Sequence, residues 1–131
     1  MSNSRTSKWM IDLPKTLRSF RYAWAGIVAL FTHENNARVH LTVALIVISA
    51  GLFWGISAVE WMLVGVAIGG VWAAEAFNTA LEKLCDVVQP QQDPRIKAIK
   101  DLAAAGVFVM ALVAVMIGLI IFGPRFIDLI T

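Results

Sequence analysis

Carboxylate and amide side chains recur at helical spacing within one short stretch of the chain. Five polar residues share this spacing: Glu75, Asn78, Thr79, Glu82 and Asp86. Their offsets of 3, 4, 7 and 11 positions from the first of them place all five side chains on one face of a helix. Carboxylate oxygens are the hard ligands that Mg²⁺ prefers, and bound Mg²⁺ commonly carries phosphate groups as well. This stretch therefore indicates chemistry on a magnesium-bound phosphate.

The composition shows which kind of element carries this polar face. The chain has 131 residues, of which 59% are hydrophobic and 15% are charged, whereas soluble domains average roughly 45–50% apolar and about 25% charged residues. Residues 39–59 and 102–124 contain no Asp, Glu, Lys or Arg, and each run reaches the roughly 20 residues that a transmembrane helix needs. The chain is therefore predicted to be an integral membrane protein. Most of its 11 Lys and Arg residues flank the apolar runs, so we expect no nucleic-acid partner.

We expect an all-α membrane protein formed by a single domain over residues 1–131. An amphipathic helix is predicted to lie on the membrane surface, because apolar side chains recur at helical spacing opposite Lys15, Arg18 and Arg21. The predicted segments are a flexible region at 1–12, the surface helix at 14–33, and transmembrane helices at 38–56, 58–88 and 94–122. The second transmembrane helix is longer than the roughly 30 Å hydrocarbon core, so we expect its last turns to extend into the cytoplasm.

Basic residues are distributed unevenly around the three predicted spans. Six Lys and Arg residues precede the first span, four surround the connection at 89–93, and only Arg125 follows the third span. Cytoplasmic loops carry an excess of such residues. We therefore expect the N-terminus and the 89–93 connection in the cytoplasm and the C-terminus outside.

Helix length places the polar groups at one depth in the membrane. Glu75 lies about 27 Å along the second predicted transmembrane helix, at 1.5 Å per residue, and thus near the inner boundary of the hydrocarbon core. Glu82 lies about 10 Å further. Glu34 comes just before the first span, and Lys100 and Asp101 lie at the start of the third. Charged groups from three segments are therefore predicted to converge at the cytoplasmic interface.

A convergent set of this kind suits phosphoryl transfer from MgATP to a lipid. Carboxylates can hold Mg²⁺, and a lysine adds a positive charge for phosphate. Glu75, at the hydrocarbon edge, can meet the hydroxyl group of a lipid and act as its general base. A charged residue near mid-bilayer costs about 2.5–3.5 kcal/mol, so acids in membrane helices usually mark function. The combined prediction is lipid phosphorylation driven by positioning and charge neutralisation.

Structural roles for the same residues remain open on this reasoning. The acids at the end of the polar face can form a solvated helix end, and Glu75 can pair with Lys100. His33 and His40 are interpreted as interfacial or packing residues, because no third ligand is spaced for a metal. Glu60 is interpreted as part of a capping box with the serine three residues before it rather than as a catalyst.

The polar face also resembles a known sequence pattern. It contains the motif Glu75-Ala-Phe-Asn78-Thr79-Ala-Leu-Glu82-x-x-x-Asp86, which is followed by Lys100-Asp101-x-Ala103-Ala104. This pattern is similar to that of the bacterial diacylglycerol kinase and undecaprenol kinase family of small integral-membrane lipid kinases. The similarity covers about residues 19–124 and includes Tyr22-Ala-Trp24-x-Gly26 and Glu34-Asn35-x-x-Arg38-Val39-His40. The last stretch looks more like the undecaprenol kinase branch.

The resemblance implies a role for each of these residues. Glu75 would be the general base toward the lipid hydroxyl, and Glu34 and Glu82 would hold the catalytic Mg²⁺. The residues that would contact ATP are Tyr22, Asn78, Asp86, Lys100 and Asp101. The family further implies a homotrimer in the bacterial cytoplasmic (inner) membrane, with sites assembled between neighbouring chains.

The leading hypothesis is a lipid kinase that transfers the γ-phosphate of ATP to a lipid alcohol, undecaprenol or diacylglycerol, at the cytoplasmic interface. The alternative is a small oligomeric transporter in which Glu75 relays a proton or an ion, although transport sites favour the bilayer midplane. A third hypothesis is a non-catalytic membrane subunit.

Overall fold

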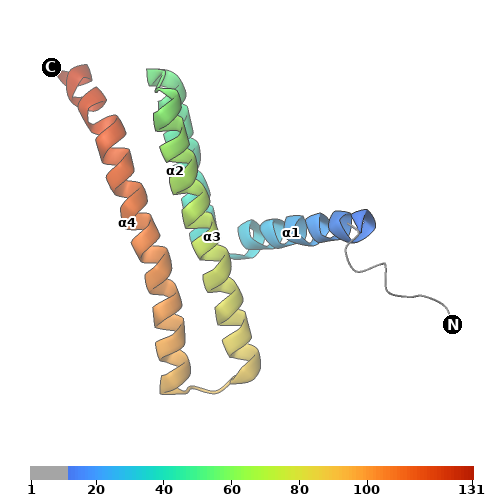
Figure 1. Cartoon of the computed structure of the whole chain (residues 1–131). Coiled ribbons are helices and arrows are strands. Elements are labelled where there is room, and N and C mark those ends of the chain that lie inside the picture. The colour runs from blue at the N-terminus through green and yellow to red at the C-terminus, as the bar shows by residue number, and fades with distance from the viewer. Residues whose placement is uncertain (1–11) are drawn as a thin grey trace.

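The computed structural model describes residues 12–131, and this part of the chain is α-helical apart from its connections. Its helices are α1 (Leu13–His33), α2 (Asn35–Trp54), α3 (Ala58–Val88) and α4 (Pro94–Ile130). Helices α2, α3 and α4 run alongside one another, and α1 extends crosswise from them (Figure 1). The all-α prediction is confirmed. Of the predicted flexible segment at 1–12, only residue 12 lies within the described range.

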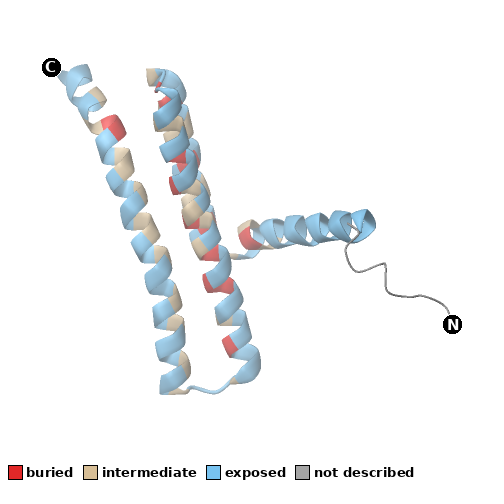
Figure 2. Ribbon diagram, in the orientation of Figure 1, coloured by how far each residue is buried: buried red, intermediate tan, exposed pale blue. Residues whose placement is uncertain are grey.

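Helices α2, α3 and α4 are each long and apolar enough to cross a membrane. Most of their residues are not buried within the chain, and on α4 only Ile121 and Phe122 are buried (Figure 2). Exposed apolar surface of this extent is unfavourable in water, but it matches a hydrocarbon solvent. The prediction of three transmembrane helices is therefore supported by the fold, and the protein is a membrane protein.

Helix α1 also carries large apolar side chains that are not buried within the chain. Leu17, Phe20 and Trp24 are 68%, 69% and 66% exposed, although all three are large apolar or aromatic side chains. Near its C-terminal end α1 contacts α3, where the rings of Phe31 and Trp72 pack edge to face with centroids 5.1 Å apart. The position of α1 on a membrane surface stays a prediction, and its unburied apolar face agrees with it.

The start of α3 is fixed by local hydrogen bonds. Gly55 ends α2 in the left-handed conformation with φ of 59°, which glycine adopts at no steric cost. Ser57 Oγ then accepts a hydrogen bond from the backbone of Glu60 (3.3 Å), and the Glu60 carboxylate accepts one from the backbone of Ser57 (2.8 Å). The predicted capping box is confirmed.

The observed α2 and α4 differ in length from the predicted helices. Helix α2 spans Asn35–Trp54 rather than 38–56, and α4 continues to Ile130 instead of ending near 122. Proline inside a helix removes one backbone donor, so the sequence suggested an end close to Pro124. Next to this proline, the Arg125 guanidinium donates to the carbonyl of Ile121 and lies 2.9 Å from the carboxylate of Glu60 on α3.

An apolar core lies at the end of the bundle where α2 turns into α3. It is formed by Ile56, Val64, Ile121 and Phe122, all of which are buried. The Trp54 ring packs beside it, with its centroid 5.9 Å from that of Phe122. Because lipid tails are as apolar as these side chains, the core holds the helices together by van der Waals packing and not by removal from water. This core holds α3 against α4 at one end, and the polar residues of α3 lie toward its other end.

Candidate active site

The polar end of α3, defined here as residues 75–86, begins with a buried carboxylate. The Glu75 side chain is only 3% exposed, and its Oε1 atom lies 3.1 Å from Nε2 of His40 on α2. A buried carboxylate needs a partner, because an unpaired buried charge is costly. Lys100, a possible partner on the sequence alone, pairs with Asp86 instead, and the partner of Glu75 is His40.

Sequence reasoning missed the role of His40 in this pair. It interpreted His40 as a packing or interfacial residue because no metal-ligand spacing surrounds it. A usable signal was present: His40 is a polar residue within the uncharged run at 39–59, close to its predicted cytoplasmic start and thus near the depth estimated for Glu75.

The next turn of the polar end links Asn78 to Glu82. Asn78 is 8% exposed, and its Nδ2 donates a 2.9 Å hydrogen bond to Glu82 Oε1. Its Oδ1 is buried without a hydrogen-bond partner within the described chain. Buried polar atoms are nearly always satisfied, so this oxygen is positioned for a donor or a cation that is not part of the chain.

Glu34 reaches the polar end from the junction between α1 and α2. It is the capping residue at the end of α1 and at the start of α2, and its Oε1 lies 3.2 Å from Lys83 Nζ on α3. Lys83 directly follows Glu82 in the chain. The two predicted magnesium ligands therefore belong to neighbouring parts of the structure, each held by its own polar partner.

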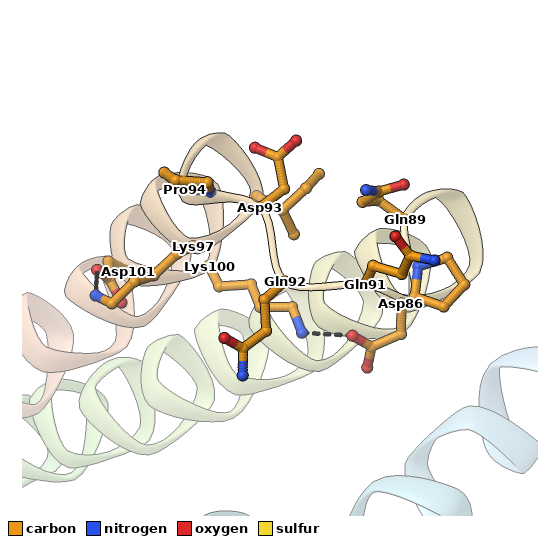
Figure 3. Close-up of a pocket in the computed structure, with 11 residues that line it drawn as sticks. Asp86, Gln89, Gln91, Gln92, Asp93, Pro94, Lys97, Lys100 and Asp101 are labelled. Atoms are coloured by element: carbon orange, nitrogen blue, oxygen red, sulfur yellow. Dashed lines mark hydrogen bonds and ion pairs between the residues drawn. The ribbon is translucent and has the colours of Figure 1, made fainter.

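A cavity of about 710 Å³ lies at the connection between α3 and α4. Three predicted nucleotide residues, Asp86, Lys100 and Asp101, line this cavity (Figure 3). Lys100 Nζ lies 2.5 Å from Asp86 Oδ1, so the ion pair joins α4 to the end of α3. The cavity is open to solvent, and polar and charged side chains make up most of its lining.

Further charged residues of α4 surround the same cavity. Lys97 lines it and lies 2.5 Å from Asp101 Oδ2. Sequence reasoning missed Lys97, although its position four residues before Asp101 is the spacing of a helical ion pair.

Asp93 caps α4 by accepting a 2.8 Å hydrogen bond from the backbone of Arg95. Hydrogen bonds from the Arg95 side chain hold the pKa of Asp93 below its usual value, so this carboxylate stays ionised at the positive end of the helix.

Tyr22 lies apart from the other predicted nucleotide residues. It belongs to α1, which extends away from α3 and α4 (Figure 1), and it is 64% exposed. The Arg21 guanidinium lies 5.7 Å from the centre of its ring. Within one chain, Tyr22 does not line the cavity that Asp86, Lys100 and Asp101 share.

The described residues contain no cluster of three or more His, Cys, Asp or Glu side chains that could hold a metal ion by themselves. Mg²⁺ does not require such a cluster, because it usually takes one or two carboxylates together with phosphate oxygens and water. Glu82, with the unpartnered Asn78 Oδ1 beside it, and the nearby Glu34 provide only hard oxygen donors. This donor set fits Mg²⁺ brought with a nucleotide.

Comparisons with known proteins cover the part of the chain that contains these residues. The profile of the family described as prokaryotic diacylglycerol kinase matches residues 21–122, a range that includes every predicted site residue. The undecaprenol kinase of Bacillus subtilis (strain 168) is 36% identical over 114 residues, which cover 87% of this chain and 93% of that protein. The diacylglycerol kinase of a Synechocystis species is 34% identical over 115 residues, which cover 87% of this chain and 65% of that protein.

Proposed function

Because this chain belongs to the prokaryotic diacylglycerol kinase family and is a lipid kinase, we propose that it transfers the γ-phosphate of ATP to undecaprenol or diacylglycerol at the cytoplasmic face of the membrane. The observation that carries the proposal is the buried Glu75. This carboxylate lies on an apolar helix long enough to span a membrane, a few turns before a polar cavity. A lipid hydroxyl and a water-borne nucleotide can both approach that region.

Glu75 acts as the general base in this reaction. Its carboxylate accepts the proton of the lipid hydroxyl while the hydroxyl oxygen bonds to the γ-phosphorus, and the bond between that phosphorus and the bridging oxygen of ADP breaks. General base catalysis by a positioned side chain typically contributes about 10²–10⁴-fold to a rate. Support for this role comes from the burial of Glu75 and from its pairing with His40 rather than with a permanent cation.

The nucleotide binds at the cavity between α3 and α4. Lys100 and Asp86 hold each other in the free protein, and an incoming phosphate can take the lysine as its own partner. Asp101 lines the same cavity, and Asn78 offers its free Oδ1. Glu34 and Glu82 would hold Mg²⁺, which supplies neutralisation of the phosphate charge when it is bound.

Tyr22 can join this site if it comes from a neighbouring chain. In one chain it lies on α1, away from the cavity. We therefore propose a homotrimer, the assembly that the family resemblance implies, in which α1 of one subunit approaches the nucleotide site of another. The broad exposed apolar surfaces of α2, α3 and α4 leave area for such contacts. Cross-linking in detergent micelles should then produce no species larger than three chains.

The orientation in the bacterial cytoplasmic (inner) membrane follows from the distribution of charge. The N-terminus and the connection at 89–93 would face the cytoplasm, and the C-terminus would lie outside, because basic residues gather on the first side. This orientation places the nucleotide cavity where ATP is present.

The test is a phosphorylation assay with two lipids side by side. Purified protein in detergent micelles receives radiolabelled MgATP together with undecaprenol and diacylglycerol at equal mole fraction. We expect label in a lipid phosphate. We expect undecaprenol to be the preferred substrate, because the relative that this chain matches over 93% of that relative's length is an undecaprenol kinase. ATP consumption without any labelled lipid would contradict the proposal. Solute counterflow across proteoliposomes without ATP use would favour the transporter alternative, which the comparisons do not support.

A further inference from the structure

Phosphorylation of an alcohol by ATP releases a proton that must leave the site. An alcohol and ATP⁴⁻ give a phosphomonoester dianion, ADP³⁻ and H⁺, so a base that accepts the proton must lose it before the next turnover. The Glu75 side chain is 3% exposed, and it has almost no contact with water through which to lose that proton.

His40 contacts Glu75 and is itself partly exposed. Its Nε2 lies 3.1 Å from Glu75 Oε1, and its side chain is 25% exposed. The imidazole therefore contacts the buried carboxylate and also reaches the protein surface. Histidine suits proton transfer because one ring nitrogen can accept a proton while the other releases one.

The other titratable groups near this pair are engaged elsewhere in the described part of the chain. Glu34 pairs with Lys83, and Glu82 accepts from Asn78. Helix α4 has no titratable side chain between Asp101 and Arg125. His33, at the end of α1, is exposed.

We propose that His40 orients the Glu75 carboxylate and takes from it the proton that Glu75 removes from the lipid alcohol, then passes a proton to water. The O–H bond of the alcohol breaks as its oxygen bonds to the γ-phosphorus, and the proton moves to the Glu75 carboxylate. It then moves to Nε2 of a neutral imidazole that carries its own proton on Nδ1. The resulting imidazolium donates its Nε2–H to the ionised Glu75 carboxylate and releases its Nδ1 proton to water, and proton exchange with water restores the starting tautomer before the next turnover. His40 is thus a positioning and proton-relay residue that acts through Glu75, and this inference depends on Glu75 being the general base.

A His40→Gln variant separates orientation from proton transfer. The glutamine amide can still donate a hydrogen bond to Glu75, but it cannot carry a proton. We expect kcat for lipid phosphorylation to fall about 10- to 100-fold, at the lower end of the range for a proton-transferring side chain, while KM for MgATP changes less than about twofold because the nucleotide cavity is untouched. Added imidazole should restore part of kcat in a His40→Ala variant, since a small diffusible base can enter the space of the missing ring. His33→Gln is the matched control, and its kcat should equal that of the unchanged protein.

Each result has a definite meaning if all variants are assayed on material that elutes from size exclusion at the position of the unchanged protein. Full kcat in His40→Gln, or a loss in His40→Ala that imidazole does not reverse, overturns the relay. A Glu75→Gln variant run in parallel distinguishes failure of the proton relay from failure of the general-base role. If Glu75→Gln is inactive while His40→Gln is fully active, only the relay fails. If Glu75→Gln is fully active, the general-base role fails and the relay fails with it.

Discussion

Asn78 offers a direct way to distinguish a functional polar group from a structural one. It is buried, its amide nitrogen holds Glu82 Oε1 at 2.9 Å, and its Oδ1 has no partner in the described chain. Asn78→Leu removes both groups with little change in side-chain volume. If the unpartnered oxygen is there for the nucleotide or its metal, this change should affect activity much more than stability.

The stability change can be estimated from the two polar atoms. Loss of a hydrogen bond to a charged group costs about 1.5–3 kcal/mol, and removal of a buried unsatisfied carbonyl returns about 1–3 kcal/mol. The two terms nearly offset each other, so the free energy of unfolding should change by less than about 2 kcal/mol. Loss of a charge-assisted contact to the bound nucleotide or its metal is instead expected to lower kcat/KM for MgATP by about 10- to 100-fold.

The assay pairs SDS-induced unfolding in detergent micelles with lipid phosphorylation kinetics on the same preparations. Thr79→Val is the matched control, because Thr79 is also 8% exposed and has no assigned role. It should retain kcat/KM within about twofold of the unchanged protein. The reasoning is refuted if Asn78→Leu keeps full activity, or if it unfolds so easily that the loss of folded protein accounts for the loss of activity.

Three further predictions concern parts of the fold that hold or orient the site. Ser57→Ala should lower the free energy of unfolding by about 1 kcal/mol through loss of the α3 cap and leave kcat unchanged, which SDS unfolding and the phosphorylation assay can check. Gly51→Ala should destabilise the protein by about 1–3 kcal/mol, because a Cβ there would lie 2.8 Å from the Trp61 ring; an unchanged free energy of unfolding would contradict this packing. A cysteine replacing Gln91 should react with a membrane-impermeant maleimide only after permeabilisation of cells, and labelling of intact cells would reverse the proposed orientation.

The sequence predicted the fold well because its strongest signals are local. Apolar runs of membrane length and the capping box at Ser57 and Glu60 depend on residues near one another in the chain, and the structure confirms three apolar helices and that cap. The end of α4 could not be predicted in the same way. Its continuation past Pro124 accompanies a contact between Arg125 and Glu60, two residues far apart in sequence.

The candidate site shows the same limit. Helical spacing predicted a shared face for Glu75, Asn78 and Glu82, because that face is a property of one helix. The partner of Glu75 depends on how α2 packs against α3, and periodicity gives no information about that packing, so His40 was missed. The placement of Tyr22 away from the cavity has a related cause, since it depends on how α1 lies relative to α3 and α4, which helical spacing does not predict.

We propose above that Glu75 takes the proton of a lipid alcohol beside a nucleotide held between α3 and α4. The most direct measurement is the single-turnover rate of phosphoryl transfer from ATP to the lipid in Glu75→Gln, together with the Kd of MgATP for the same variant. We predict a rate lower by about 10²–10⁴-fold with a Kd within about twofold of the unchanged protein, because Glu75 is not among the residues that line the nucleotide cavity. An unchanged transfer rate in correctly assembled Glu75→Gln would contradict the claim.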